Sequence, residues 1–167
     1  MNDMRQVEFI PFWLTDEAEI YTIRIGDKSD SETHEFIMMF KDSGNPELKD
    51  DFARIFQTLK NISVNGAEEN MFRPEGSIKD RVCALPLITA RKSKKRGGTL
   101  RIYCIRVSSK LLILGGGGEK TTQTYQEDPA LNEKVQTLQK IDKILSSLEA
   151  DGMDLNKEII NLTINID

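Results

Sequence analysis

Two stretches of the chain each combine a helix-start signal with apolar residues at helical spacing. Asn45 can accept a hydrogen bond from the first helical turn, and Pro46 suits the first helical position. Asp128 and Pro129 repeat this signal later in the chain. The apolar stripes that follow are Leu48, Phe52, Ile55, Phe56, Leu59 and Ile62 in the first stretch, and Leu131, Val135, Leu138, Ile141 or Asp142, Leu145 and Leu148 in the second.

These stripes predict two amphipathic helices that bury one face against the rest of the fold. The first helix is expected to end at Asn65-Gly66 and the second at Gly152, because these residues tolerate a positive φ angle. We interpret Phe52 and Phe56 as core residues of the first helix.

The remaining apolar segments are short and have the character of strands. They lie in runs before, between and after the helices, so strands and helices do not alternate strictly along the chain. This arrangement favours an α+β fold, with a mostly antiparallel sheet packed against the two helices. Asp27 to Thr33 is polar and is interpreted as a turn. The predicted strands cover residues 7–13, 19–25, 35–41, 81–88, 100–107, 111–114 and, in the tail, 158–166.

The length of 167 residues favours a single domain. We divide it into an acidic N-terminal extension (1–34), a core (35–147) and a C-terminal strand extension (148–167). The sequence shows no secretory signal and no apolar run of the roughly 20 residues that span a bilayer. Cys83 and Cys104 fall in predicted strands and are interpreted as small core residues in a reducing, cytoplasmic compartment.

Charge is unevenly distributed along the chain. Residues 73–126 contain twelve Lys or Arg against three acids, a net charge of +9, whereas the remainder has eleven bases and twenty-four acids, a net charge of −13. A basic centre in an acidic frame predicts that one segment contacts a polyanion. The alternative is that the two parts neutralise each other within the fold.

Several kinds of catalytic or binding site are disfavoured. The only histidine, His34, lies in a polar region and is expected to be a surface residue, and one histidine excludes a Cys₂His₂ zinc site. The glycine run 115–118 can turn bare backbone N–H groups toward a phosphate, or it can be a strand exit that needs unusual dihedral angles. It matches neither nucleotide-binding glycine pattern.

The predicted strand 100–107 carries basic residues on both faces. Side chains alternate along a strand, so Arg101, Tyr103 and Ile105 share one face while Arg106 lies on the other. Arginines among apolar neighbours are costly unless they reach water, a carboxylate or a phosphate. We therefore expect either a phosphate contact or a salt bridge to a helix.

The segment from Arg81 to Asp128 resembles bacterial toxins of the RelE, ParE and HigB superfamily. It contains a basic loop after a strand, Ala90-Arg91-Lys92-Ser93-Lys94-Lys95-Arg96, and then Leu100-Arg101-Ile102-Tyr103. A hydrophobic hairpin strand and Gly118-Glu119-Lys120-Thr121-Thr122-Gln123-Thr124-Tyr125 follow. The resemblance covers roughly residues 35–147 and assigns the capped helix at 45–65 to the helical element before the sheet. The chain departs from the family in its acidic balance and its two extensions.

The resemblance implies a RelE-like fold and an mRNA-cleaving toxin that needs no metal or other cofactor, acts on free or ribosome-bound mRNA, and is silenced by a cognate antitoxin protein. Arg101 would stabilise the reacting phosphate, Lys120 would bind phosphate, and Tyr125 would stack on a base or transfer a proton. The nucleic-acid contacts would come from Arg81, Arg91, Lys92, Lys94, Lys95 and Arg96. Two alternatives stay open: a non-catalytic nucleic-acid or ribosome-binding module on the same fold, and an interaction protein whose basic loop docks an acidic partner.

Overall fold

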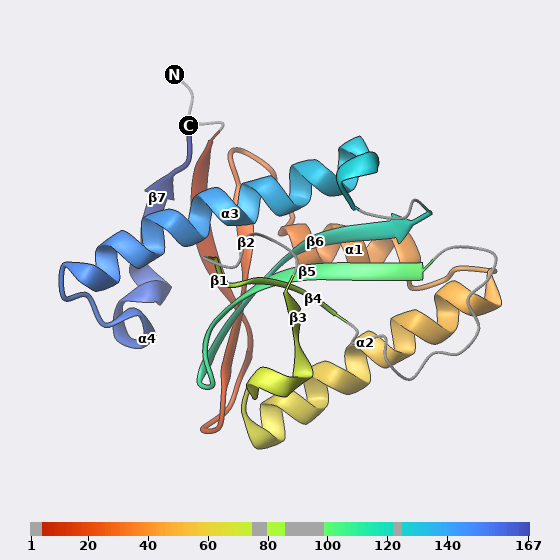
Figure 1. The fold of residues 1–167 in the computed structure, drawn as a ribbon, viewed down its shortest axis with the longest axis horizontal. Coiled ribbons are helices and arrows are strands. Elements are labelled where there is room, and N and C mark those ends of the chain that lie inside the picture. Colours follow the sequence, from red (N-terminus) through yellow and green to blue (C-terminus); the bar gives the residue numbers. More distant parts are fainter. Residues whose placement is uncertain (1–4, 75–79, 86–98, 122–124) are drawn as a thin grey trace.

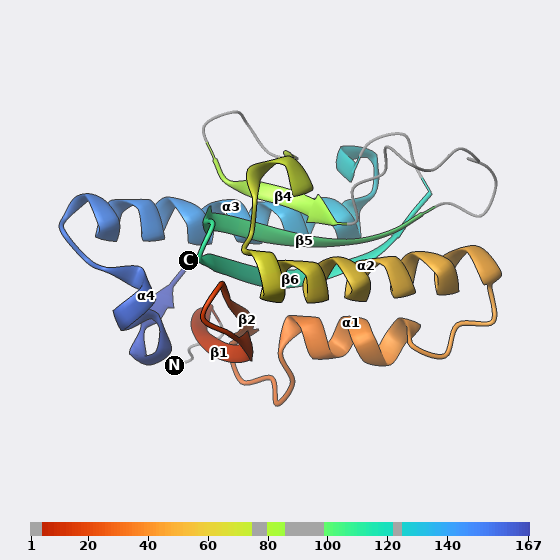
Figure 2. The same ribbon diagram turned by 90° about the horizontal axis from the view of Figure 1, so that it is seen from below.

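The chain folds into an α+β structure, which a computed structural model describes for residues 5–74, 80–85, 99–121 and 125–167. Within these residues seven strands form one mixed sheet in the order β3-β4-β5-β6-β2-β1-β7. Figure 1 shows the strands and helices, and the second view shows helix α3 on one side of the sheet and helices α1 and α2 on the other (Figure 2). The sheet is therefore enclosed between helices on both faces.

The two N-terminal strands agree with the prediction. Strands β1 (Gln6–Leu14) and β2 (Glu19–Ile25) pair antiparallel, with an irregularity between Pro11 and Trp13. Strand β2 then pairs parallel with β6, whereas the other neighbouring strands of the sheet are antiparallel. The expectation of a mostly antiparallel sheet thus holds with one parallel pair.

The prediction of a strand at 35–41 is wrong, because this segment belongs to helix α1 (Glu32–Phe40). The hydroxyl of Ser31 accepts a hydrogen bond from the backbone N–H of His34, which caps the first turn. Phe36 and Phe40, four residues apart, have ring centroids at 5.3 Å on the buried side of the helix. A short apolar run is compatible with either a strand or a helix, and the cap and this spacing favour the helix.

Helix α2 (Pro46–Asn65) has the predicted limits. The side chain of Asn45 accepts hydrogen bonds from the N–H groups of Glu47 (2.9 Å) and Leu48 (3.4 Å), and Gly66 ends the helix at φ 93°. Phe52 and Phe56, predicted as core residues, are partly buried and pack against the core on the α1 and α2 side of the sheet. The ring centroid of Phe52 lies 6.2 Å from that of Phe36. A 3₁₀ turn (Glu69–Met71) follows the helix.

The central strands are β3 (Arg73–Pro74), β4 (Val82–Leu85), β5 (Thr99–Ser108) and β6 (Leu111–Lys120). The predicted strand 81–88 is confirmed over β4, and residues 86–88 lie outside the described part of the chain. The hairpin β5–β6 is also confirmed, but β6 extends through the whole glycine run.

The C-terminal part begins with a 3₁₀ turn (Tyr125–Glu127) and helix α3 (Pro129–Ala150), which Asp128 caps as predicted. Helix α4 (Leu155–Glu158) and a further 3₁₀ turn (Ile159–Asn161) follow, and β7 (Thr163–Asn165) pairs with β1. The predicted tail strand 158–166 is therefore mostly wrong. Leu155 and Ile159 are buried at helical spacing, while Ile160 is exposed, so the helical packing overrides the alternating pattern.

The two faces of the sheet carry separate hydrophobic cores. The core under α3 contains Tyr103, Ile105, Leu138 and Ile141, and the core under α1 and α2 contains Phe36, Ile55, Ile102 and Cys104. The alternation predicted along β5 is confirmed, because Tyr103 and Ile105 face α3 while Ile102 and Cys104 face α2.

Close packing around β6 leads to a stability prediction. A Cβ atom at Gly117 would lie 2.0 Å from the backbone oxygen of Arg101, so the backbone of β5 or β6 would have to move. We expect Gly117→Ala to lower the free energy of unfolding by about 2 kcal/mol or more, the cost typical of overpacking. Gly44→Ala is the control, because nothing lies within 4 Å of its Cβ position. Urea unfolding of both variants tests this, and equal midpoints would contradict it.

Candidate functional site

Arg101, Lys120 and Tyr125, the predicted catalytic residues, come together at one end of the β5–β6 pair. Arg101 is opposite Gly118 in the ladder, and Lys120 is two residues beyond Gly118 and opposite Thr99. Residues opposite each other on paired strands, and residues two apart on one strand, point to the same face of the sheet. Arg101 therefore shares the α3 face with Tyr103, and Lys120 lies on that face as well. Tyr125 lies on the same face, in the turn that leads into α3.

An aromatic pair anchors the end of this site. The ring of Tyr125 meets the ring of Tyr103 edge-on, with centroids 6.3 Å apart. Tyr103 is two residues from Arg101 on the same face of β5, so the edge-on contact holds Tyr125 close to the predicted phosphate-binding arginine.

The site is closed in this structure. Arg101 is 4% exposed and Tyr125 is 8% exposed, whereas Lys120 is only partly buried. Helix α3 approaches closely here, since a Cβ atom at Gly118 would lie 3.2 Å from the side chain of Leu131. Arg101 therefore lies beneath the surface, and a large ligand reaches it only if the surrounding chain moves.

The basic loop is attached at this same end of the sheet. Strand β4 ends at Leu85, opposite Ile102, and β5 starts at Thr99, opposite Lys120. The connection between Leu85 and Thr99 contains Arg91, Lys92, Lys94, Lys95 and Arg96, the predicted nucleic-acid contacts, and they lie outside the described residues. Both ends of the connection are thus next to the cluster of Arg101, Lys120 and Tyr125.

A buried carboxylate holds the start of β5, and the sequence analysis missed it. Asp51 on α2 is 2% exposed, and its carboxylate accepts a hydrogen bond from the backbone N–H of Leu100 at 2.9 Å. Its position three residues after Leu48 and four before Ile55 places it on the buried stripe of α2. An acid on an apolar stripe is the signal that could have identified this anchor.

Arg81 lies apart from this cluster and has a structural role. It precedes β4, at the opposite end of the strand from Leu85, and pairs with residues of α3. Its guanidinium donates to Asp142 at 2.8 Å and to Ser146 at 2.9 Å, and lies 2.9 Å from a carboxylate oxygen of Glu149. The backbone N–H of Arg81 also donates to Asp142 at 2.9 Å. Burial works against the charge, but the carboxylates of Asp142 and Glu149 raise the pKa of Arg81 above its ordinary value.

The glycine run does not form the loop that the sequence analysis considered. Among the described residues only Gly26, Gly66 and Gly152 have positive φ, so the run 115–118 stays in the strand without positive φ angles. The β5–β6 register nevertheless shifts between Ile102 and Cys104, so the ladder is irregular at Gly115 and Gly116. A Cβ atom would lie 3.0 Å from Leu138 at Gly115 and 3.0 Å from Glu32 at Gly116. The absence of side chains therefore serves the close approach of helices.

Two threonines fix α1 beside this part of β6. The pairing of β2 with β6 ends at Thr22 and Leu114. The hydroxyl oxygen of Thr22 lies 3.2 Å from the carbonyl oxygen of Leu114, and that of Thr33 lies 3.0 Å from the carbonyl oxygen of Gly115. The two hydroxyl oxygens are 2.6 Å apart. The two hydroxyls thus form one polar cluster that joins β2 and α1 to β6.

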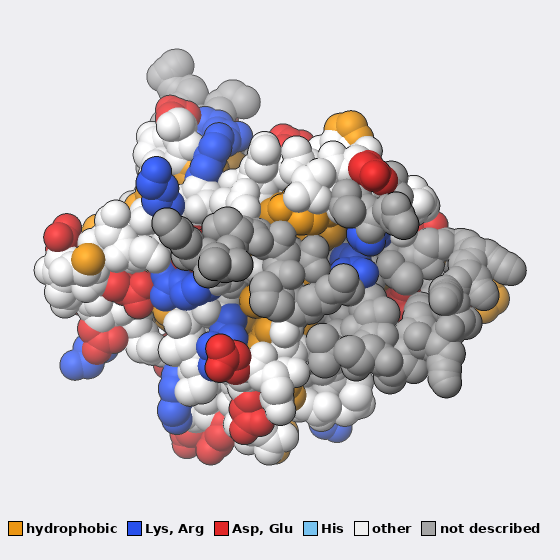
Figure 3. Space-filling model, viewed as in Figure 1, with side chains coloured by type: hydrophobic (Ala, Val, Ile, Leu, Met, Phe, Trp, Pro, Cys, Tyr) orange, Lys and Arg blue, Asp and Glu red, His pale blue; other side chains and the backbone are white. Residues whose placement is uncertain are grey.

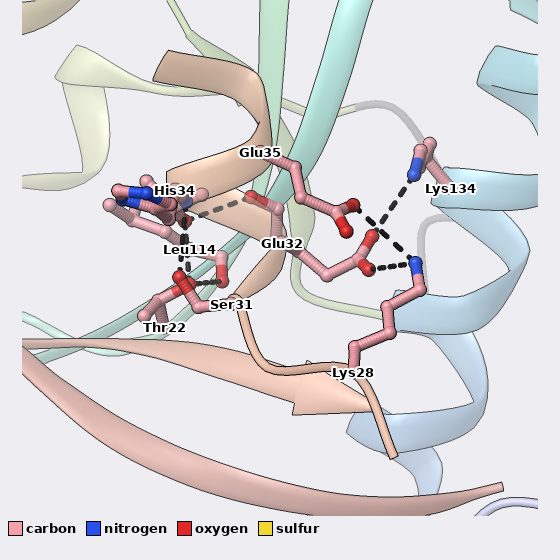
Figure 4. A network of polar contacts seen from close by, with 10 residues as sticks. Thr22, Lys28, Ser31, Glu32, His34, Glu35, Leu114 and Lys134 are labelled. Atoms are coloured by element: carbon pink, nitrogen blue, oxygen red, sulfur yellow. Dashed lines mark hydrogen bonds and ion pairs between the residues drawn. The ribbon is translucent and has the colours of Figure 1, made fainter. Parts of the chain in front are cut away.

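A buried carboxylate links α1 to α3 over Gly116 (Figure 4). Glu32, 5% exposed, accepts from Lys134 at 3.0 Å and from Lys28 at 3.2 Å. Partial burial of Lys28 works against its charged form, but the neighbouring charge of Glu32 outweighs this effect and raises the pKa of Lys28 above its ordinary value.

A cavity of about 520 Å³ lies beside this ion pair, and the mixed charges of its lining do not favour an anion. The charged residues that line it are Arg5, Lys28, Glu32, Glu133 and Lys134. His34 is exposed, as predicted, 3.9 Å from Asp30.

No family model, curated protein or solved structure matches the chain. The described residues contain no group of three or more His, Cys, Asp or Glu side chains able to hold a metal ion. No helix in the described part is long and apolar enough to cross a membrane.

The ion pairs of Arg81 allow a second prediction. Asp142→Ala would leave the partly buried guanidinium and the backbone N–H of Arg81 without this carboxylate, so we expect a loss of about 3 kcal/mol in the free energy of unfolding. Asp50→Ala is the control, because Asp50 forms an exposed pair with Arg54 at 3.6 Å, which is worth about 0.5 kcal/mol or less. Thermal and urea unfolding of the two variants measure the difference. Similar stabilities would show that α3 is held to β4 without Asp142.

Proposed function

We propose that this chain is a toxin-like RNA endonuclease of a toxin–antitoxin pair that cleaves RNA without a metal ion. One observation carries the proposal: Arg101, Lys120 and Tyr125 converge on one face and one end of the β5–β6 pair, where both ends of the basic connection are attached. Two cationic side chains, a phenol and a polybasic segment in one place are the kinds of group that contact nucleic-acid phosphates.

The cleavage chemistry follows from the groups available. The ribose 2′-hydroxyl attacks the neighbouring phosphorus after losing its proton, negative charge grows on the phosphate oxygens, and the 5′-oxygen leaves after gaining a proton. Arg101 is assigned to the growing charge and Lys120 to holding the phosphate before reaction. Tyr125 is assigned to stacking on a base or to moving a proton.

The arrangement of the chain supports the same proposal. Helix α2 precedes the antiparallel strands β3 to β6, where the resemblance to the RelE, ParE and HigB superfamily puts the helical element. The two strands that end this unit carry Arg101 with Tyr103 and Gly118 with Lys120. Arg81 is left out of the proposed RNA contacts, because its guanidinium is held by α3.

Burial of the cluster constrains how the site works. Arg101 and Tyr125 are 4% and 8% exposed, so the proposed enzyme is closed until RNA or a partner opens the chain around them. The same burial favours one second candidate, a nucleic-acid-binding module without catalysis, in which Lys120 and the basic connection contact the RNA backbone.

Induced expression in a bacterial host tests the proposal, with growth and mRNA integrity measured together. We expect growth arrest and mRNA fragments from the wild type, and relief by Arg101→Ala, because the growing charge on the phosphate would lose its cation. Tyr125→Phe keeps the ring contact with Tyr103 and removes only the hydroxyl, so relief by this variant indicates proton transfer. Cleavage by purified protein should fall by about 100-fold or more in Arg101→Ala. In Tyr125→Phe a fall of that size assigns the hydroxyl to proton transfer, and unchanged cleavage assigns the ring to stacking.

Arg54→Ala is the matched control, because Arg54 lies on α2 and pairs with Asp50 on the helix surface. Thermal unfolding of each variant separates loss of activity from loss of fold. RNA binding without cleavage by the wild type would favour the second candidate. Unimpeded growth together with no RNA binding by soluble protein would overturn both.

A further inference from the structure

The two cysteines, which belong to separate strands, lie directly opposite each other. Cys83 of β4 and Cys104 of β5 are partners in the antiparallel ladder. Both side chains belong to the core on the α2 face, and the two cysteines are not joined by a disulfide. The thiol of Cys104 donates to the backbone carbonyl of Cys83 at 3.7 Å, so its sulfur already lies against the residue opposite.

The ladder fixes the separation of the two residues. The backbone N–H of Arg106 donates to the carbonyl of Arg81 at 3.0 Å, which makes this a hydrogen-bonded pair. Pairs alternate along an antiparallel ladder, so Cys83 and Cys104, two positions further on, are of the same kind, with Cα atoms about 5.5 Å apart. Disulfides span Cα separations of about 4.4–6.8 Å. In a hydrogen-bonded pair the Cβ atoms lie toward the far end of the roughly 4.5–5.5 Å range, whereas a disulfide spans about 3.5–4.5 Å, so the two strands must approach each other by about 1 Å for the bond to form.

The two thiols differ in their access to solvent. Cys83 is 8% exposed, and its strand β4 has only four residues, whose outer neighbour β3 has two. Cys104 is 0% exposed, and burial raises its pKa well above the ordinary value, with a smaller contribution from Cys83. A short strand near the sheet edge opens locally more readily than a central one. Cys83 is therefore the thiol that a small oxidant reaches first, and Cys104 is positioned to react second.

We propose that Cys83 and Cys104 are a peroxide-sensitive pair that forms a reversible intramolecular disulfide. The Cys83 thiolate attacks one oxygen of hydrogen peroxide, the O–O bond breaks, and a sulfenic acid and one water form after proton transfer. The Cys104 sulfur then attacks the sulfur of Cys83 and displaces the hydroxyl as a second water. Two thiols are oxidised and one peroxide is reduced to two waters. The bond would tie β4 to β5 one residue pair before Ala84 and Tyr103, on the strands that carry the basic connection.

The proposal does not depend on the nuclease proposal and is tested on the folded full-length chain. Native protein is treated with hydrogen peroxide, alkylated, digested and mapped by mass spectrometry. We expect loss of both free thiols and a Cys83–Cys104 cross-linked peptide, at a rate independent of protein concentration and reversed by dithiothreitol. Free thiols in the native protein after treatment, a cross-link seen only in denaturant, or a linkage between chains would each overturn the proposal.

Two single variants test the assigned order of reaction. Cys104→Ser should leave Cys83 as a sulfenic acid that dimedone traps, because the second thiol is gone. Cys83→Ser should leave Cys104 largely unmodified at the same peroxide dose, because Cys104 is fully buried. Thermal unfolding shows whether each variant keeps its fold, and the wild-type peptide map remains decisive if either does not. Equal labelling of the two variants would overturn the assigned order.

Discussion

The bare backbone of residues 115–118 lets two helices and a neighbouring strand approach β6 more closely than side chains would permit. Helix α3 lies over Gly115 and Gly118, the Glu32 and Lys134 pair crosses Gly116, and β5 lies against Gly117. Strand β6 is also the point at which the sheet changes from antiparallel to parallel pairing. The position of Lys120, at the end of this strand, and the placement of α1 and α3 therefore depend on four positions without side chains.

The uneven charge along the sequence has two different outcomes in the fold. Part of it is internal, because Arg81 is neutralised by Asp142 and Glu149 of the acidic C-terminal region. The guanidinium of Arg106 keeps its charge but is held within the fold, where it donates to the backbone carbonyl of Ala67 at 2.7 Å. On the face shown in Figure 3, basic and acidic side chains are interspersed in this way toward the end of α3. The basic residues of the 86–98 connection remain the part of the charge pattern that the proposed RNA contact uses.

The two proposals concern neighbouring parts of the same pair of strands. The proposed nuclease cluster lies on the α3 face of β5, and the cysteine pair lies on the α2 face, between β5 and β4. Both ends of the basic connection belong to these two strands. Oxidation at Cys83 and Cys104 would thus tie together the two strands to which the basic connection is attached.

Local chemistry was sufficient to predict much of the structure from the sequence. Asn45 and Asp128 cap their helices as expected, and the alternation of Arg101, Tyr103 and Ile105 along β5 determines which face they share. These features depend on residues close together in the chain. Where two local signals competed, the prediction failed: the run at 35–41 is a helix because a serine cap and contacts with α2 outweigh its strand-like composition.

Only the tertiary structure decided the features that depend on distant residues. It showed that residues 115–118 are packed strand, because the helices that require glycine there come from other parts of the chain. It assigned Arg81 to α3, Asp51 to the start of β5, and Cys83 to a position opposite Cys104. The sequence by itself determined which residues carry charge, caps and apolar faces. Strand order and register determined which of them meet, because pairing across a sheet depends on how the whole chain packs.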